Sequence, residues 1–264
     1  RADIASFDWA QSCSKMISQV DAIIYMAYST SSDAAYDRRG NFEGLKEIVS
    51  AVKTERLIFL STIGVFGSSS KDGEYTENSP KIIDSIYVKD KIDAENFLAG
   101  CNSIPRRTVL YISNAYELGS SRIKYYSSLL KLGYFVYKKN GNGIYNVVHS
   151  SDAADAVILS MNTENGTEFN SYIVNGEYIK HREFSAAIEE YFEYAKKPRL
   201  PSFLAPVFKW HIKKIPAIFG FRAPLRITEP KATLFEAGIF FSNKKIMTEL
   251  KWLPKKNVKN IIKK

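Results

Sequence analysis

The stretch 56-RLIFLST-62 decides the fold class, because it is short, apolar and followed by small polar residues. A run of this kind is typical of a strand that is buried on both faces of a parallel sheet. A similar run, 21-DAIIYMA-27, precedes it, and 106-RRTVLYISNAY-116 follows it. Apolar residues at helical spacing separate the three runs, over 41–53 and 88–100. Strands that alternate with helices predict right-handed βαβ units and an α/β fold with a parallel sheet.

The pattern changes after residue 120. Helices are predicted over 120–133 and 181–195, and 198–230 contains six of the nine prolines, which favours short broken helices. A strand that runs into a helix over 145–161, and a further strand over 171–176, suit the sheet better. The sequence is therefore divided into two regions. The first comprises 1–120, with 145–176 returning to the sheet, and the second comprises 121–144 and 177–264.

The composition is that of a globular protein, with 45% hydrophobic and 25% charged residues among 264. No apolar run approaches the roughly 20 residues that cross a bilayer, and no signal segment opens the chain. The two cysteines, Cys13 and Cys101, have no metal-ligand spacing. We expect a cytoplasmic protein with no metal site.

The net charge of +9 is unevenly distributed, since residues 196–264 contain 17 Lys and Arg against 3 Asp and Glu. A basic segment of this kind can attract a phosphate-bearing ligand, a nucleic acid or an anionic membrane, or can be an ordinary solvated surface. Aromatic residues do not alternate with basic ones as in an RNA-binding sheet. We therefore expect no nucleic-acid partner.

Polar residues lie where the predicted strands end. Thr62 ends one strand, Asn114 ends the next, and Tyr87 and Lys91 begin the helix between them. In an open α/β sheet the carboxyl ends of the strands form the ligand-binding crevice. Residues four apart share one face of a helix, so Lys91 can lie near the phenol of Tyr87.

The same spacing recurs at Tyr134 and Lys138, in the run "YFVYK". That run is aromatic and β-branched, which favours a strand, where residues four apart do not stack as they do on a helix. The second pair is therefore interpreted as a chance match.

The order of motifs resembles the extended branch of the short-chain dehydrogenase/reductase superfamily, the nucleotide-sugar epimerases, dehydratases and reductases. The motifs that carry the resemblance are Asp3 with Ile4, "DAIIYMAY", "NFEGLKEIV", "STIGVFG", "YTENSP", "YVKDKIDAE", "YISNAYELG" and "VVHSSDAAD". They span about residues 3–160, and "FFSNKKIMTELKWLP" (240–254) resembles the family's C-terminal motif. The resemblance implies a Rossmann-like parallel sheet flanked by helices, with a small, mostly helical C-terminal substrate domain. On this basis 1–120, with 145–176, would form a partial Rossmann dinucleotide-binding domain, and 121–144 and 177–264 would form the substrate-binding region.

The resemblance also implies a chemistry. Tyr87 would be the general acid/base for a substrate hydroxyl or keto group. Lys91 would lower its pKa and bind the nicotinamide ribose of NAD or NADP, and Tyr87 would also contact this cofactor. Thr62 would hydrogen-bond the same substrate oxygen. These three residues form the expected catalytic triad.

Further roles follow from the same resemblance. Asp3 and Ile4 match the pair that contacts adenine, and Ala27 lies beside the cofactor's ribose and phosphates. Asn114 matches a residue on the substrate side. For His149 a packing and hydrogen-bonding role is favoured over catalysis, since no cysteine or serine partner shares a motif with it.

Three features depart from the family pattern. The glycine-rich phosphate loop is absent, and the chain begins within the repeating pattern, so we expect two strands and a helix to precede it and a sheet edge to be exposed here. Ile63 and Gly64 stand where the family's dehydratases have an Asp-Glu pair, which disfavours a dehydratase. Tyr111 replaces the Arg of the family's R-x-x-N motif.

Several functions remain open from the sequence. The leading hypothesis is a nucleotide-sugar epimerase or 4-keto reductase in surface polysaccharide biosynthesis. The alternatives are a sterol-type hydroxyl dehydrogenase/isomerase, in which 203–222 would contact a membrane, and a non-catalytic dinucleotide-sensing module. A homodimer is compatible with each.

Overall fold

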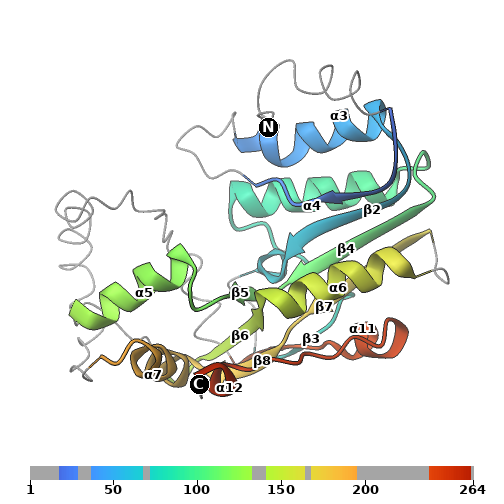
Figure 1. Cartoon of the computed structure of the whole chain (residues 1–264). Coiled ribbons are helices and arrows are strands. Elements are labelled where there is room, and N and C mark those ends of the chain that lie inside the picture. Colours follow the sequence, from blue (N-terminus) through green and yellow to red (C-terminus); the bar gives the residue numbers. More distant parts are fainter. Residues whose placement is uncertain are drawn as a thin grey trace.

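The computed structural model of this chain has a parallel four-stranded sheet at its centre (Figure 1). Its strands follow the order β1 (Gln19–Tyr25), β2 (Lys53–Thr62), β4 (Arg106–Ile112) and β7 (Phe169–Val174). Neighbouring strands are all parallel, which confirms the predicted α/β class. The structure describes residues 18–28, 37–67, 72–132, 141–163, 168–194 and 238–262.

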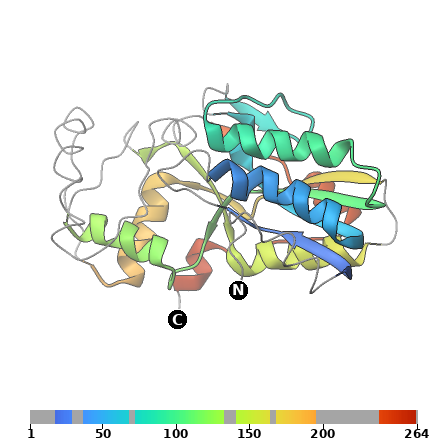
Figure 2. The same cartoon turned by 90° about the horizontal axis from the view of Figure 1, so that it is seen from above.

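Helices cover both faces of this sheet, as Figures 1 and 2 show. On one face lie a short π-helical turn, η1 (Arg39–Glu43), α3 (Gly44–Ala51) and α4 (Ile86–Ala99). On the other face lie α6 (Ser150–Asn162) and α11 (Lys244–Glu249). Each face has its own apolar core, because side chains of one strand alternate between the two faces.

The predicted strand over 106–116 is wrong as a single element. β4 ends at Ile112, and β5 (Asn114–Tyr116) belongs to another sheet, where it pairs with β6 (Ile144–His149). Ser113 lies at the change, and its backbone N–H still donates to Val174 of the central sheet. An apolar pattern continues through such a change, since both segments are buried.

The second region is built around the three-stranded sheet of β5, β6 and β8 (Glu177–Lys180). The helices α5 (Ser121–Leu132) and α7 (His181–Tyr191), with the short α12 (Val258–Ile262), share one apolar cluster with it. In Figure 1 these elements lie beside the carboxyl ends of β2 and β4. This arrangement places a second group of elements next to the expected crevice.

The segment after residue 238 returns to the central part of the fold. β9 (Ile239–Phe241) pairs in parallel with β3 (Gly73–Tyr75), far away in the sequence. The indole of Trp252 donates to the Asp152 carbonyl, and the Asp152 carboxylate accepts the backbone N–H groups of Lys255 and Lys256. The motif residues "VVHSSDAAD" thus hold the C-terminal segment.

His149 acts at the start of α6. Its Nδ1 accepts the backbone N–H of Ser151 at 3.2 Å, as a helix-capping side chain does. This agrees with the predicted packing and hydrogen-bonding role.

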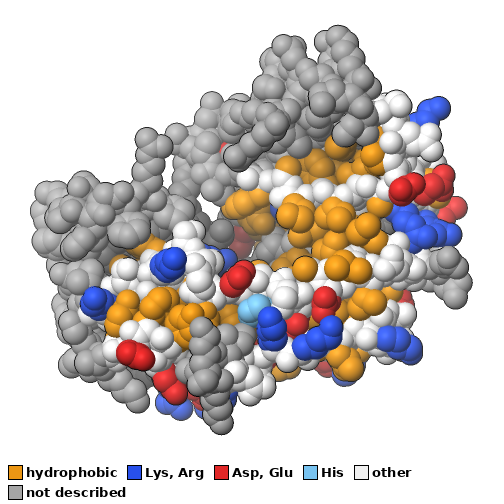
Figure 3. Space-filling model, in the orientation of Figure 1, with side chains coloured by type: hydrophobic (Ala, Val, Ile, Leu, Met, Phe, Trp, Pro, Cys, Tyr) orange, Lys and Arg blue, Asp and Glu red, His pale blue; other side chains and the backbone are white. Residues whose placement is uncertain are grey.

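Hydrophobic side chains gather on the surface over β1 and α6 (Figure 3). Among the residues that the structure describes, β1 is an edge strand of the central sheet, and Ile24, Met26 and Ile158 are exposed there. The described helices include none with the length and apolar character that a membrane span requires.

An ion pair joins η1 to α4. Arg38 donates to the fully buried Asp90 at 2.6 Å and to Asp93 at 3.0 Å, and Asn41 also hydrogen-bonds Asp90. Burial raises the pKa of Asp90, and Arg38 opposes that rise. The carboxylate therefore needs Arg38 as its counter-charge.

We expect Arg38→Met to lower the free energy of unfolding by about 2 kcal/mol, because Asp90 would lose the cation that balances its burial. The loss should be smaller than for a fully buried pair, since about a third of the Arg38 side chain is exposed. Urea denaturation measures this value. The control is Lys89→Met, which removes a surface ion pair with Asp93 and should change stability by at most about 0.5 kcal/mol. Equal losses in the two variants would contradict the anchoring role of Arg38.

Candidate active site

Thr62 lies where β2 ends and the 3₁₀ turn η2 (Ile63–Phe66) begins. Its extended backbone and its hydroxyl form the start of this turn, and Oγ1 accepts the backbone N–H of Gly64 at 3.1 Å. The hydroxyl is therefore fixed at the carboxyl edge of the sheet.

Tyr87 occupies the first turn of α4, which begins there because the Ser85 hydroxyl accepts the backbone N–H of Val88. A side-chain hydrogen bond joins Tyr87 to Thr62. Burial raises the pKa of Tyr87, Tyr28 raises it further, and the Thr62 hydrogen bond opposes the rise. The phenol is therefore protonated at neutral pH.

Tyr28 is a neighbour that the sequence analysis missed. Its ring packs edge-on against Tyr87 with centroids 4.7 Å apart, although almost half of Tyr28 is exposed. It directly follows Ala27 at the exit of β1, so the motif residue Ala27 lies at the same edge of the sheet. The only feature of the sequence that could have indicated a role for Tyr28 in the site is its position directly after the end of a predicted strand.

Lys91 lies one turn after Tyr87 and is almost completely buried. Its ammonium donates to the Leu60 carbonyl at 2.8 Å and lies 4.6 Å from the centroid of the Phe59 ring. Burial lowers the pKa of Lys91 to about 8, while Glu95 and Asp90 oppose that shift. The residue is still mostly protonated at neutral pH.

The pair meets as the spacing predicted, with Lys91 Nζ 5.9 Å from the Tyr87 ring centroid. The expected lowering of the Tyr87 pKa by Lys91 differs from the structure, in which that pKa is raised. The reason is that burial outweighs the other effects and that the ammonium is directed to Leu60 on β2. The spacing therefore predicted that Tyr87 and Lys91 lie close together, but it did not predict the direction of the Tyr87 pKa shift.

The remaining predicted residues are only partly described. Asn114 begins β5 and donates from its side chain to the Asn146 carbonyl at 2.9 Å, so its amide braces the neighbouring sheet. Asp3 and Ile4 lie outside the described residues. So do Tyr134 and Lys138, the second pair with the same spacing.

The chemistry of the site fits a dinucleotide cofactor better than a metal. Hydroxyl and ammonium donors converge at the carboxyl edge, and the buried Ser113 Oγ, just after β4, has no hydrogen-bond partner among the described residues. Such donors suit ribose hydroxyls and a sugar oxygen. The described residues contain no cluster of His, Cys, Asp and Glu that could bind a metal ion.

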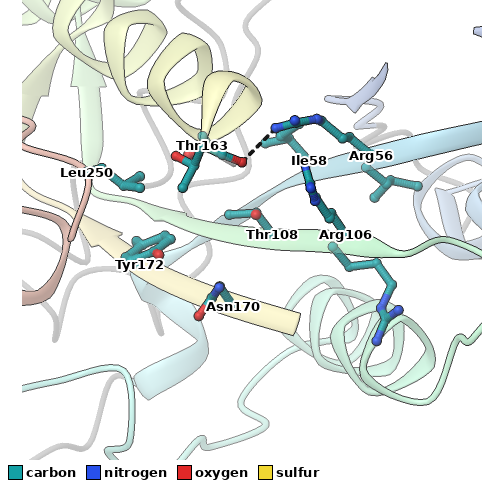
Figure 4. A pocket seen from close by; sticks show the side chains of 11 residues that line it. Arg56, Ile58, Arg106, Thr108, Thr163, Asn170, Tyr172 and Leu250 are labelled. Carbon is teal, nitrogen blue, oxygen red and sulfur yellow. Dashed lines mark hydrogen bonds between the residues drawn. The ribbon is translucent and has the colours of Figure 1, made fainter. Parts of the chain in front are cut away.

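A cavity of about 30 Å³ lies at the opposite edge of the sheet, around the amino ends of β2, β4 and β7 (Figure 4). It is far smaller than the roughly 300 Å³ of a ligand pocket. Arg56, which lines it, already donates to the carbonyls of Met161 and Thr163 at the end of α6, and Arg106 points away from it in Figure 4. The cavity is therefore not a candidate ligand-binding site, in contrast to the crevice at Thr62 and Tyr87.

The buried Lys91 predicts a characteristic pH dependence. We expect the free energy of unfolding of the wild type to increase relative to that of Lys91→Met between pH 8 and 10.5. Over this window the folded chain has released the Lys91 proton, whereas the unfolded chain still holds it. Stability rises with pH wherever the unfolded state binds more protons. Chemical denaturation from pH 7 to 10 tests this, and a difference that stays constant with pH would contradict it.

Comparisons with known proteins agree with this geometry. The model of the NAD dependent epimerase/dehydratase family matches residues 1–174. No match was found among curated protein sequences.

Several solved structures share the fold. The chain is similar to UDP-glucose 4-epimerase of Thermotoga maritima with UDP-glucose, at a TM-score of 0.74 and 16% identity, covering 99% of this chain and 81% of the other. For UDP-glucuronic acid 4-epimerase of Bacillus cereus, with UDP-glucuronic acid and NAD, the values are 0.71, 16%, 99% and 78%. For the Bordetella bronchiseptica enzyme WbmG, with NAD and UDP, they are 0.70, 17%, 99% and 76%. At these identities the likeness shows the fold alone.

The family match covers well over half of the chain, and the central parallel sheet has the helix-covered arrangement of these enzymes. This chain therefore belongs to the NAD dependent epimerase/dehydratase family.

Proposed function

We propose that the protein is an NAD-dependent epimerase or reductase that acts on a hydroxyl or keto group of a nucleotide sugar. The observation that carries the proposal is the hydrogen bond between Thr62 and Tyr87, with Lys91 one helical turn away, at the carboxyl edge of the sheet. This edge is where open α/β sheets bind their ligands.

Tyr87 is the proton-transferring group. Its raised pKa keeps the phenol protonated, so it can donate a proton to a keto oxygen of the sugar. When it takes a proton from a hydroxyl instead, the nearby ammonium of Lys91 stabilises the phenolate. Thr62 orients the same substrate oxygen through its hydroxyl.

The cofactor would lie along the ends of β1 and β4. NAD, when bound, supplies the hydride chemistry that no side chain can provide. Lys91 and Ala27 would hold its ribose and phosphates, and the buried Ser113 hydroxyl, which has no partner among the described residues, is a further donor at that edge. Asp3 and Ile4 are proposed to contact the adenine.

The substrate would bind between this edge and the second region, with Asn114 on its side of the crevice. We assign residues 121–144 and 177–264 to the substrate-binding region. The neighbouring structures contain UDP-glucose, UDP-glucuronic acid and UDP, and the basic charge of 196–264 suits a nucleotide diphosphate.

The turn after Thr62 argues against a dehydratase. A Cβ at Gly64 would lie 3.3 Å from the Thr62 hydroxyl, and the Ile63 side chain is buried. A side chain at position 64 would require Thr62 to shift by a few tenths of an ångström, and a carboxylate at position 63 would replace a buried apolar side chain. Elimination through a carboxylate pair is therefore not available here.

No observation supports either of the two alternative functions, the sterol-type dehydrogenase/isomerase and the non-catalytic dinucleotide sensor. The segment 203–222, on which the sterol-type reading rests, lies outside the described residues. A non-catalytic sensor would have no need for the bonded Thr62–Tyr87 pair beside a buried lysine.

We expect Tyr87→Phe to lower kcat by about 10²- to 10⁴-fold with little change in NAD binding, because only the transferred proton is lost. Turnover of a panel of UDP-sugars with NAD tests this. The matched control is Tyr172→Phe, which removes a buried phenol that bonds Glu249 on the far face. Unchanged turnover in Tyr87→Phe would refute the proposed role.

Thr62 provides a second test. We expect Thr62→Ala to lower kcat by about 10- to 10³-fold, and Thr62→Ser to retain most activity, because serine keeps the hydroxyl that bonds Tyr87. Steady-state kinetics on the best substrate of the panel measure both. Equal losses in the two variants would indicate that the methyl group, and hence packing, is what matters.

A further inference from the structure

Glu95 is a buried carboxylate on α4, only 2% exposed, with three partners. Ser61 donates to its Oε1, the Tyr111 hydroxyl donates to its Oε2 at 3.1 Å, and the Lys81 ammonium lies 2.5 Å from the same Oε2. The partners come from β2, β4 and the segment that precedes α4. Glu95 thus joins α4 to β2, to β4 and to the segment that precedes α4.

The carboxylate lies directly behind the proposed catalytic pair. Tyr87, Lys91 and Glu95 follow one another at intervals of four, so they share one face of α4. Ser61, which bonds Glu95, is the residue before Thr62. The negative charge also opposes the fall of the Lys91 pKa that burial causes.

Lys81 anchors residues 76–85, the segment that leads into Tyr87. The backbone N–H of Ile82 donates to the Val65 carbonyl at 2.8 Å, so the segment lies on the turn after Thr62. A Cβ at Gly67 would lie 2.5 Å from Ile82 Cβ, which shows how close the two backbones are. Next to this close contact, Lys81 connects the segment to α4 through its ion pair with the buried Glu95.

Position 111 supplies no charge to Glu95, and Lys81 supplies the cation. In the family pattern R-x-x-N the first residue is arginine, whereas this chain has Tyr111, a neutral donor. The Lys81 ammonium lies 5.3 Å from the centroid of the Tyr111 ring. The cation therefore approaches the same carboxylate from a different segment.

We propose that Lys81 and Glu95 form a positioning pair, in which Lys81 supplies the counter-charge that position 111 lacks and Glu95 holds Thr62, Tyr87 and Lys91 in register. The expected effect of this pair on turnover rests on the proposed function. Its expected effects on stability and on the titration of Lys91 rest only on the buried contacts. A buried carboxylate that loses the cation paired with it is left with a poorly compensated charge.

The charged groups that act on Lys91 are few. Glu95 and Asp90 both lie on α4 and raise its pKa, and Asp90 is itself paired with Arg38 from η1. On the β2 side Lys91 contacts the Leu60 carbonyl and the Phe59 ring, which carry no charge. Removing the charge of Glu95 should therefore be detectable at Lys91.

The first experiment follows Lys91 directly by NMR, in protein labelled with ¹³C at the lysine Cε and assigned with Lys91→Arg. We expect Lys91 in Glu95→Gln to titrate at lower pH than in the wild type. Lys89→Met, which alters an exposed lysine of the same helix, should leave the titration of Lys91 in place. An unchanged titration in Glu95→Gln would overturn the electrostatic part of the proposal, whether or not a substrate has been identified.

The second experiment is a rescue. We expect Lys81→Met to lower kcat/KM and Lys81→Met/Tyr111→Arg to recover most of it, because an arginine at position 111 can reach Glu95. Tyr111→Phe, which removes a neutral hydrogen bond and keeps both charges, should have a smaller effect than Lys81→Met. A double variant as impaired as Lys81→Met would overturn the counter-charge role.

Two readouts separate this proposal from the proposed function. If no UDP-sugar is turned over by the wild type, the thermal midpoints of the same variants still report the pair: Lys81→Met should lower the midpoint and the added Tyr111→Arg should restore it. If the wild type is active and neither variant alters activity or midpoint, the positioning pair is refuted while the catalytic assignment stands.

Discussion

The burial of charge on α4 is the constraint on which the rest of the structure depends. Asp90, Lys91 and Glu95 are each at most 3% exposed, although they lie on one 14-residue helix. Ionised groups of this kind are stable inside a protein only when they are paired or hydrogen-bonded. The helix must therefore lie where every one of them finds its partner.

Those partners come from separate parts of the chain, and this fixes the site. Arg38 approaches from η1, the Leu60 carbonyl from β2, and Lys81, Ser61 and Tyr111 surround Glu95. Moving α4 along the sheet by one turn would separate all of them at once. The relative position of Thr62 and Tyr87 is thus determined by contacts one and two turns further along the helix.

The sequence predicted what is local or periodic. The apolar runs gave the strands of the central sheet, and the four-residue interval brought Tyr87 and Lys91 together. It could not predict the break at Ser113, because β4 and β5 are separated by one residue and differ in their partner strands, which the sequence pattern does not report. Lys81 and Tyr28 were not predicted for a related reason. Their roles depend on contacts with residues of other elements, and no spacing in the sequence indicates such contacts.

The Lys81–Glu95 pair is difficult to explain by stability alone. Replacing a buried ion pair by apolar residues of similar volume is often neutral or stabilising. The neighbouring core is itself apolar and contains Phe59, Phe66 and Leu98, so apolar residues at positions 81 and 95 could pack against it. What an apolar pair could not provide is a fixed negative charge near a buried ammonium whose pKa has fallen to about 8. Lys91 would then lose its proton closer to neutral pH, and Tyr87 would lose the nearby positive charge that the proposed proton transfer requires. The buried carboxylate is therefore better explained by the charge that Lys91 must hold than by the packing of α4.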